Sequence, residues 1–395
     1  MTGLPERLQV TLFRDMPAEG RTSMEVYASE LASALRAHRW GQLTVDECSY
    51  DEVRLVRRGL PFPLAAKIDN YLSRFVGYPL SARRQRAHVY HIVDHGYGHL
   101  AYALDRSRTV VTCHDLMLLR AADGSVPQLP RPRIATAAFR VSLSALPRVA
   151  QVVADSETTK LDVTSYLGVP PERVVVIPPG VSPQFRSLPP AESAAACETL
   201  SPRLLGQGPF VLHVGSVSPY KNIEGLLRVF ARVARTLESD AVLVRAGSKL
   251  EEKHLLLADS LGVADRIIDL GEVTTAQLVA LYNRCDVLLF PSFYEGFGWP
   301  PLEAMACGTP VVTSTAPALV ETTGDAALHE DATNHAALAA AVARVLSDAE
   351  LRERLQARGL RRAGEFTWAR TADRLGTLYE DVARAAARGH ALERV

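Results

Sequence analysis

The sequence predicts an α/β protein made of two domains, each a doubly wound parallel sheet. Short runs of β-branched and apolar residues alternate along the chain with stretches of helical periodicity, which is the pattern of βαβ units. Most of the runs are mainly apolar and do not alternate strictly with polar residues, as expected for strands buried on both faces of a parallel sheet. The whole pattern occurs twice, on either side of a segment rich in proline, serine and alanine.

The predicted elements follow one another in that alternating order. Strands are expected in the first half at Leu8–Phe13, Gln42–Cys48, Val89–Val93, Thr109–Cys113, Gln151–Ala154 and Arg173–Ile177. In the second half they are expected at Phe210–Gly215, Ala241–Ala246, Ile267–Leu270, Val287–Pro291 and Pro310–Thr315. Helical patterns include Asn222–Leu237, Thr274–Cys285, His335–Leu346 and the amphipathic C-terminal stretch Thr371–Ala387.

These elements predict a domain division. Residues 1–185 form the first domain, 186–207 a linker with room for one short helix, 208–370 the second domain, and 371–395 a C-terminal helix and tail. Two such domains facing each other would place a ligand cleft between the carboxyl ends of their sheets.

Composition excludes several classes of protein. The 395 residues carry 44 basic and 44 acidic side chains, and 47% of the chain is hydrophobic. This composition is that of an ordinary globular protein and not of a disordered chain or a fibrous rod. The balanced charge also argues against a nucleic-acid partner.

Cysteine usage and the N-terminus favour a cytoplasmic location. The five cysteines are odd in number and contain no CxxC pair, so neither a disulfide framework nor a structural zinc site is expected. Charged residues interrupt Met1–Asp15, which excludes a secretory apolar core there. The longest uncharged stretches, Leu204–Tyr220 and Ala304–Val320, are broken by glycine and proline, so no spanning helix is expected.

One stretch is strongly basic. Arg54–Arg86 holds eight basic residues and a single acid, Asp69, with apolar and aromatic residues interleaved. One interpretation is a solvated, arginine-rich helix face. The other is a peripheral contact with an anionic membrane, at the inner membrane face, or with an acidic acceptor.

The most informative segment is Phe290–Val312, FPSFYEGFGWPPLEAMACGTPVV. A buried strand leads into a loop and then into a short helix that begins with Pro300 and Pro301 and ends at Gly308. The loop Gly296–Gly298 allows backbone to approach a ligand closely, and the helix N-terminus adds N–H donors and partial positive charge.

Two carboxylates flank this loop, Glu295 at its start and Glu303 eight residues later, which we expect in the first helical turn. A first-turn Glu can simply favour the helix dipole. Two acids around a Gly-aromatic-Gly loop at the end of a strand also suit vicinal hydroxyls, which carboxylates bind through paired hydrogen bonds and which sugars and riboses offer.

The spacing Glu295-x7-Glu303 resembles the signature of the retaining glycosyltransferases of family 4, mannosyltransferase-like group 1 enzymes with the GT-B fold of two facing Rossmann-like domains. Further segments resemble the same family in the same order: VVTCHDL at Val110–Leu116, the stretch Val152–Val181, FVLHVGSVSPYKN at Phe210–Asn222 and FTWARTA at Phe366–Ala372. The resemblance implies that the C-terminal helix crosses back to the first domain.

The resemblance also implies roles for individual residues. Glu295 would contact the hydroxyls of the donor sugar, Glu303 would hold the nucleotide ribose, and Lys221 would lie on the diphosphate. His114 would lie over the sugar, although a lone His beside an Asp also suits a structural role. The remaining residues implied at the donor are Gly215, Ser216, Gly271, Val273, Gly296, Phe297 and Gly298.

The chain departs from the family pattern at the diphosphate. Ser216 stands where many members have Arg. Arg245, at the end of a predicted strand, is a candidate replacement, and a structural ion pair is the alternative. The glycine-rich loop of the first domain is reduced to AEGRTS, in which Gly20 and Arg21 are the candidates to approach the phosphate.

The implied reaction moves a hexose, with mannose from GDP-mannose as the leading donor, to a hydroxyl of a glycan, lipid-linked or small-molecule acceptor. This is a reaction of polysaccharide or glycoconjugate synthesis, with retention of configuration through departure and attack on one face of the sugar. No DxD pair occurs in the chain, so neither a metal nor another cofactor is expected. Charge on the leaving diphosphate would be stabilised by Lys221 and backbone dipoles.

Three other functions compete with this interpretation. A dinucleotide-dependent oxidoreductase is disfavoured, because the turns after Leu8–Phe13 and Phe210–Val214 lack GxGxxG. A sugar-nucleotide epimerase or phosphorylase of GT-B type remains an alternative. A catalytically inactive sugar-nucleotide-binding protein is also an alternative. The presence of four candidate polar residues disfavours it: His114, Lys221, Glu295 and Glu303.

Overall fold

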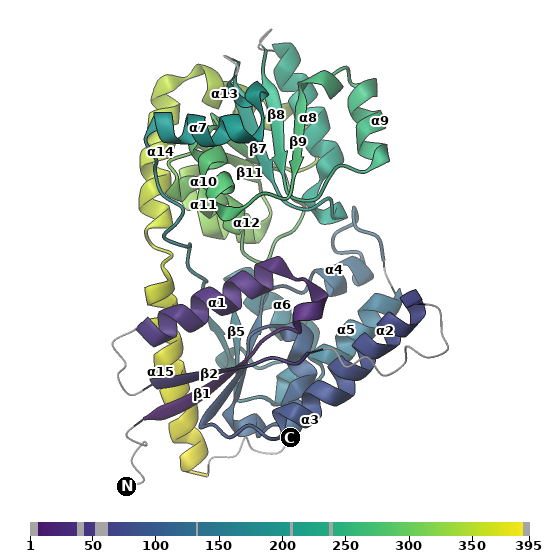
Figure 1. Ribbon diagram of the computed structural model, residues 1–395, viewed down its shortest axis with the longest axis vertical. Helices are drawn as coiled ribbons and strands as arrows, with labels where there is room; N and C mark the ends of the chain where they lie inside the picture. Colours follow the sequence, from purple (N-terminus) through teal and green to yellow (C-terminus); the bar gives the residue numbers. More distant parts are fainter. Residues whose placement is uncertain are drawn as a thin grey trace. The chain divides into compact units, whose positions relative to one another are not determined.

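A computed structural model describes residues 7–37, 43–51, 62–131, 133–205, 208–236 and 240–389 (Figure 1). The chain divides into two compact units. Unit 1 comprises Met1–Ala122, Pro132–Gly180 and Trp368–Val395, and unit 2 comprises Asp123–Arg131 and Val181–Thr367. Each unit contains a six-stranded parallel sheet flanked by helices, which confirms the predicted fold class.

The sheet of unit 1 has the strand order β2-β1-β3-β4-β5-β6. Its strands are β1 Leu8–Phe13, β2 Leu43–Cys48, β3 Val89–Ile92, β4 Thr109–Cys113, β5 Gln151–Ala154 and β6 Val174–Val176. Its helices are α1 Thr22–Ala37, α2 Phe62–Leu72, α3 Tyr78–Ala82, α4 Met117–Asp123, α5 Arg133–Leu143, α6 Glu157–Leu167 and α15 Trp368–Ala387. Every residue of β3 and β4 is buried, which explains why apolar residues in these strands do not alternate with exposed polar ones.

The C-terminal helix α15 belongs to unit 1, where it packs beside α1 (Figure 1). The Tyr379 hydroxyl lies 2.6 Å from Nδ1 of His91 on β3, and the rings of Tyr27 and Trp368 meet edge to face at 5.5 Å. These contacts confirm that the end of the chain returns to the first sheet.

The sheet of unit 2 has the order β12-β11-β10-β7-β8-β9. Its strands are β7 Phe210–Val214, β8 Val242–Ala246, β9 Ile267–Gly271, β10 Val287–Phe290, β11 Val311–Ser314 and β12 Ala327–Glu330. Its helices are α7 Pro190–Leu200, α8 Ile223–Thr236, α9 Glu252–Ser260, α10 Thr275–Arg284, α11 Trp299–Ala306, α12 Pro317–Thr323, α13 His335–Ser347 and α14 Ala349–Ala363.

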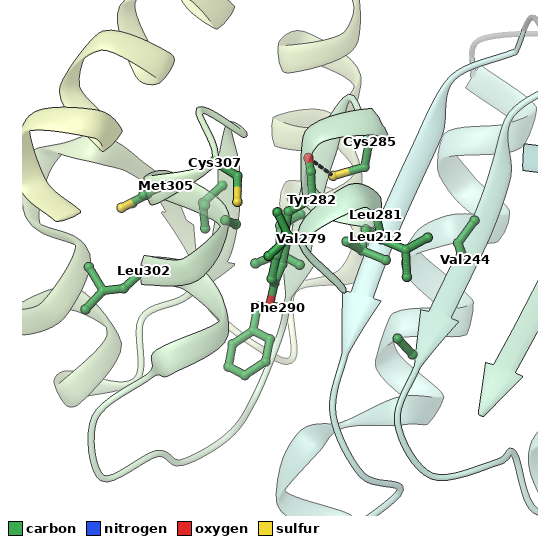
Figure 2. Close-up of a cluster of buried hydrophobic side chains, with 14 of the residues drawn as sticks. Leu212, Val244, Val279, Leu281, Tyr282, Cys285, Phe290, Leu302, Met305 and Cys307 are labelled. Carbon is green, nitrogen blue, oxygen red and sulfur yellow. Dashed lines mark hydrogen bonds between the residues drawn. The ribbon is translucent and has the colours of Figure 1, made fainter. Parts of the chain in front are cut away.

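Alternate residues of β10 face two different apolar layers. Leu288 and Phe290 pack with residues of α10 and α11, a layer that Figure 2 shows around Tyr282 and Met305. Val287 and Leu289 pack with residues of α8 and α13. The sheet is therefore buried on both faces, so it reads as a continuous apolar run in the sequence.

One expectation differs in detail. Strand β12 was not predicted, because ALHE is short and half polar, as befits a strand at the edge of a sheet. The segment expected to link the domains, 186–207, contains α7, which packs on α10 within unit 2.

All five cysteines are buried, and none of them forms a disulfide. Within the described part of the chain, no helix has both the length and the apolar character needed to cross a membrane.

Strand order fixes where a ligand crevice can form. In an open parallel sheet the crevice lies at the carboxyl ends of the two neighbouring strands where the connection direction reverses. These strands are β1 and β3 in unit 1, and β7 and β10 in unit 2. We call these positions the switch points of the two sheets.

Candidate active site

The switch point of unit 2 is built from the loops that follow β7 and β10. The chain leaves β7 through Gly215 and reaches Lys221 just before Asn222, which has a positive φ of 56°. The Asn222 side chain donates from Nδ2 to the carbonyl of Pro291 at 3.0 Å, and Phe293 N donates to Tyr220 O at 2.8 Å. The two loops are thus held together by hydrogen bonds in which both backbones take part.

This arrangement brings Lys221 and Glu295 into contact, as the sequence suggested for a common site. Nζ of Lys221 lies 2.8 Å from Oε1 of Glu295, and the two side chains are only 10% and 11% exposed. The ammonium also lies 4.8 Å from the centre of the Phe290 ring. A cation and a carboxylate therefore stand together at the switch point, where charge and hydroxyl groups of one ligand can both be recognised.

The glycine-rich loop after Glu295 is held in a conformation that favours glycine. Gly298 has a φ of 113°, and a Cβ there would approach Cδ2 of Leu319 to 2.7 Å. The carbonyl of Phe297 accepts a hydrogen bond from Thr322 Oγ1 at 2.8 Å. Helix α11 then begins at Trp299 with prolines in its first turn, as predicted, and Gly308 lies beyond its end with a φ of 81°.

Glu303 lies in the second turn of α11, not in the first, because the helix already begins at Trp299. Its Oε2 accepts a hydrogen bond from the Tyr282 hydroxyl at 2.9 Å. Burial raises the pKa of Glu303 to about 7, although the Tyr282 hydrogen bond acts in the opposite direction. Tyr282, on α10, is a partner that sequence reasoning missed, since its side chain falls in a helix of core-like pattern.

The structure assigns Arg245 to an ion pair within unit 2. The side chain is fully buried, with Nη1 at 3.6 Å from Oδ1 of Asp269 and at 3.1 Å from Ser248 O. Nη2 donates to the carbonyl of Gly215 at 3.1 Å. Of the two roles left open by the sequence, this geometry matches the structural one. Ser216, in the place of the expected cation, donates from Oγ to Ser218 Oγ at 2.9 Å.

Gly271 and Val273 lie at the carboxyl end of β9, which is separated from β7 by β8. Gly271 has a φ of 74°, and a Cβ there would meet the side chain of Lys249. Val273 packs against the apolar layer beneath α10. They are thus two strand positions from Lys221, a spacing that a nucleotide but not a phosphate alone would span.

His114 follows β4 in unit 1 and is almost entirely buried. Its Nδ1 lies 2.7 Å from Oδ2 of Asp155, and its Nε2 lies 2.8 Å from Val93 O. Burial disfavours the charged ring, but Asp155 outweighs it and raises the pKa of His114 to about 9. Both ring nitrogens are therefore engaged inside unit 1, and a role toward the sugar stays a prediction.

The switch point of unit 1 carries acids that the sequence analysis did not single out. Asp15 comes just after β1 and Asp94 just after β3, and Arg21 Nη1 donates to Asp94 Oδ2 at 2.7 Å. Burial, together with the neighbouring Asp94 carboxyl, raises the pKa of Asp15 to about 8. The signal in the sequence was an acid two residues beyond the end of a buried strand. Gly20, with a φ of 60°, uses its own N–H to close a turn onto Pro17 O.

A cavity of about 540 Å³ opens at this switch point, within unit 1. Arg21 and Gly96 line it beside an apolar wall that includes Phe75 and Phe139. Arg74 also lines it and pairs with Glu19, Nη1 to Oε1, at 2.6 Å. A volume of this size suits a small molecule or a sugar.

Comparison with known proteins adds the family context. The model described as glycosyl transferases group 1 matches residues 201–362, and that of glycosyltransferase family 4 matches residues 24–185. The serotype-specific mannosyltransferase WbdA of Escherichia coli is 31% identical over 279 residues, 67% of this chain and 32% of that protein. The O-antigen chain mannosyltransferase B of Escherichia coli is 31% identical over 263 residues, 66% of this chain and 67% of that protein. The chain spans about a third of the length of WbdA.

Solved structures share the fold at low sequence identity. A sucrose-phosphate synthase from Thermosynechococcus elongatus superposes with a TM-score of 0.73 at 21% identity, covering 96% of this chain and 100% of the other. Anabaena Alr3699/HepE, in complex with UDP-glucose, gives a TM-score of 0.72 at 16% identity, covering 95% of this chain and 100% of the other.

Proposed function

Because the chain belongs to the group 1 glycosyltransferases, we propose that it transfers a hexose from a nucleoside-diphosphate sugar to an acceptor hydroxyl with retention of configuration. The observation that carries this proposal is the contact between Lys221 and Glu295 at the switch point of unit 2. The mannosyltransferase relatives favour mannose, so GDP-mannose is the first donor to test. The UDP-glucose complex of the Anabaena protein makes UDP-glucose the second.

In this proposal the donor separates the two partners of the ion pair. Lys221 turns its charge to the diphosphate, which carries about two negative charges as it leaves. Glu295 accepts hydrogen bonds from hydroxyls of the hexose, next to the backbone of Gly296, Phe297 and Gly298. The protein then exchanges one internal ion pair for two contacts with the ligand.

Glu303 binds the ribose in this proposal. Its Oε2 already accepts the Tyr282 hydroxyl, which fixes the carboxyl group and leaves Oε1 to accept from a ribose hydroxyl. Gly271 and Val273 would face the base, at a distance from Lys221 that the ribose spans.

The diphosphate is held by few charges. Arg245 is committed to Asp269 and Gly215 O, and Ser216 replaces the usual second cation. We therefore assign the remaining diphosphate contacts to the hydroxyls of Ser216 and Ser218 and to backbone N–H groups of the loop that follows Gly215. No step in this proposal uses a metal.

The acceptor end of the reaction is proposed for the cavity at the switch point of unit 1. Its guanidinium groups are already paired with Asp94 and Glu19, so the cavity offers hydrogen bonds beside aromatic side chains and little net charge. This combination suits the hydroxyls and apolar ring faces of a sugar. His114 would act near the transferred hexose through its charge.

Thermal denaturation with a panel of nucleoside-diphosphate sugars tests the donor assignment. A true donor at 100 times its dissociation constant should add about 2.7 kcal/mol to the free energy of unfolding. The same panel with EDTA should give equal shifts, and transfer to an acceptor with the selected donor, followed by NMR, should give the same anomer as the donor. An absence of stabilisation by every sugar nucleotide would contradict the proposal.

A further inference from the structure

A helical stretch of unit 1 exposes more large apolar side chains than its role in the core explains. Helix α2 runs without a break through the π-helical turn η2 Ser73–Gly77 into α3. From the outward face of this stretch we propose that the protein docks on the surface of an anionic membrane. The proposal is independent of the glycosyl transfer, since binding to lipid requires neither donor nor acceptor.

The exposed apolar residues form one row, which we call the Leu72 ridge. It consists of Leu72, Val76 and Leu80, which are 39%, 51% and 54% exposed. They lie four positions apart, and helical residues with that spacing share a face. The ridge is therefore a continuous apolar strip along the outside of the stretch, not three scattered leucines and valines.

The inward face of the same stretch buries polar as well as apolar residues. Asp69 and Ser73 are buried there, followed by Tyr78 and Ala82. The Tyr78 hydroxyl reaches the backbone carbonyl of Cys48 at 2.7 Å. The outward face is apolar at Leu72, Val76 and Leu80, and the described part of the protein leaves these side chains partly exposed.

Tyr71 lies next to the ridge and is 56% exposed. Its ring stacks on Phe75 at 6.0 Å between centroids. Tyrosine combines an apolar ring with a polar hydroxyl and is favoured at the boundary between lipid and water. The ridge is thus bordered by a side chain suited to the level of the headgroups.

Charge at the C-terminal end of the stretch points to an anionic partner. Arg83, Arg84 and Arg86 are exposed there, whereas the one acid in residues 62–88, Asp69, is buried. Arg74 does not contribute, because Glu19 neutralises it. Arg54, Arg57 and Arg58 of the predicted basic stretch lie outside the described residues. A local cationic rim beside an aliphatic strip is the pattern of a helix lying in a membrane interface.

A membrane fits this surface better than another protein does. Three partly exposed aliphatic side chains fall well short of the ~800 Å² that each partner buries in a stable protein interface. An interfacial helix, in contrast, only has to insert its apolar side chains among the lipids. Tyr71 also lines the cavity at the switch point of unit 1, so a membrane-bound protein would hold that cavity close to lipid-linked molecules.

Vesicle co-sedimentation of the full chain tests the proposal. Vesicles of phosphatidylcholine with 30 mol% phosphatidylglycerol, as an example of an anionic surface, should bind the protein at low salt, and pure phosphatidylcholine should bind it at least tenfold more weakly. The triple variant Leu72→Ser, Val76→Ser, Leu80→Ser should bind the anionic vesicles at least tenfold more weakly. The control variant Leu255→Ser, Leu256→Ser changes exposed leucines of α9 in unit 2 and should bind like the wild type.

A second pair of variants tests the charge. Arg83→Glu, Arg84→Glu should lower anionic vesicle binding by about 25-fold or more, since each basic residue contributes about a factor of five near anionic lipid. Arg232→Glu, Arg235→Glu on α8 changes the net charge equally and should have little effect. Circular dichroism confirms that each variant is folded.

Three results would overturn the proposal. The wild-type protein could remain in the supernatant when anionic vesicles are sedimented at low salt. The ridge variant could bind as the wild type does. Analytical ultracentrifugation could show a wild-type dimer that the ridge variant abolishes, which would assign the ridge to contact between copies of the chain. None of these results bears on donor binding.

Discussion

Nζ of Lys221 lies 2.8 Å from Oε1 of Glu295, although 74 residues separate them in the chain. Neither charge is well solvated, since both side chains are about nine-tenths buried. Removing one partner of a buried pair leaves an uncompensated charge, whereas removing both together costs far less. Comparing single and double variants of this pair therefore distinguishes what the two residues contribute to stability from what they contribute to function.

Replacing both residues together should restore most of the stability that either single replacement loses, but it should not restore activity. Lys221→Met or Glu295→Gln alone should lower the free energy of unfolding by about 3 kcal/mol, and the double variant should recover most of that loss. All three should lose at least about 100-fold in transfer rate, because each charge serves the donor. Urea denaturation and initial rates measure the two effects. Normal turnover in Glu295→Gln would contradict the site assignment.

Part of this site could be predicted from the sequence, because its residues are close to one another in two short motifs. Glu295 and Glu303 belong to one strand–loop–helix segment, and Lys221 ends the loop of another. The sequence does not show which residue each of these side chains contacts in the fold. The sequence leaves two roles open for Arg245, and only the structure places Asp269, on the neighbouring strand, beside it.

The fold was easier to predict than the partners, for a physical reason. Strands buried on both faces are mainly apolar, so β4 and β10 are visible as runs in the sequence, whereas the half-polar edge strand β12 is not. Asp15 and Asp94 could have been noticed, since acids just beyond buried parallel strands lie at the carboxyl edge of the sheet, where ligands bind. Their mutual contact depends on strand order, which the sequence alone leaves open.

Glu303 should make nucleotide binding depend on pH. Its pKa is raised to about 7 by burial, and the charged carboxylate accepts the hydrogen bond from a ribose hydroxyl more strongly than the neutral acid does. Affinity for the nucleoside diphosphate should therefore rise as the pH increases through 7. Calorimetric titrations from pH 5.5 to 8.5 measure this, and Glu303→Gln isolates the part that comes from the diphosphate's own protonation.

Tyr282→Phe provides a directional check on the same group. The Tyr282 hydroxyl stabilises the carboxylate, so its removal should raise the pKa of Glu303 further. The midpoint of the pH-dependent gain in affinity should move to a higher pH. A midpoint that stays unchanged in Tyr282→Phe would show that another group titrates.

The His114–Asp155 pair should make unit 1 lose stability in alkali. The folded pKa of His114, about 9, lies above the ordinary value of 6.5, so its contribution is complete below pH 6.5 and is lost as the pH rises through 9. The full contribution is on the order of 3 kcal/mol. The free energy of unfolding, measured by urea denaturation, should therefore differ most between the wild type and Asp155→Asn at pH 6 and least above pH 9.5. Asp15 also titrates in this range, but it is common to both proteins and cancels.

The backbone at Gly298 should matter more than its missing side chain suggests. Its φ of 113° is unfavourable for any other residue, and a Cβ would also press on the buried Leu319. Gly298→Ala should therefore lower the free energy of unfolding by about 1–3 kcal/mol and shift the loop that follows Glu295. Affinity for the nucleoside-diphosphate sugar should fall with it, as measured by calorimetry.

Gly168→Ala is the matched control, because Gly168 also has a positive φ, 65°, but nothing lies within 4 Å of its Cβ position. That variant should lose stability and keep its affinity, since Gly168 only ends α6 in unit 1. Equal loss of affinity in both variants would mean that stability, not the position of the loop, limits donor binding.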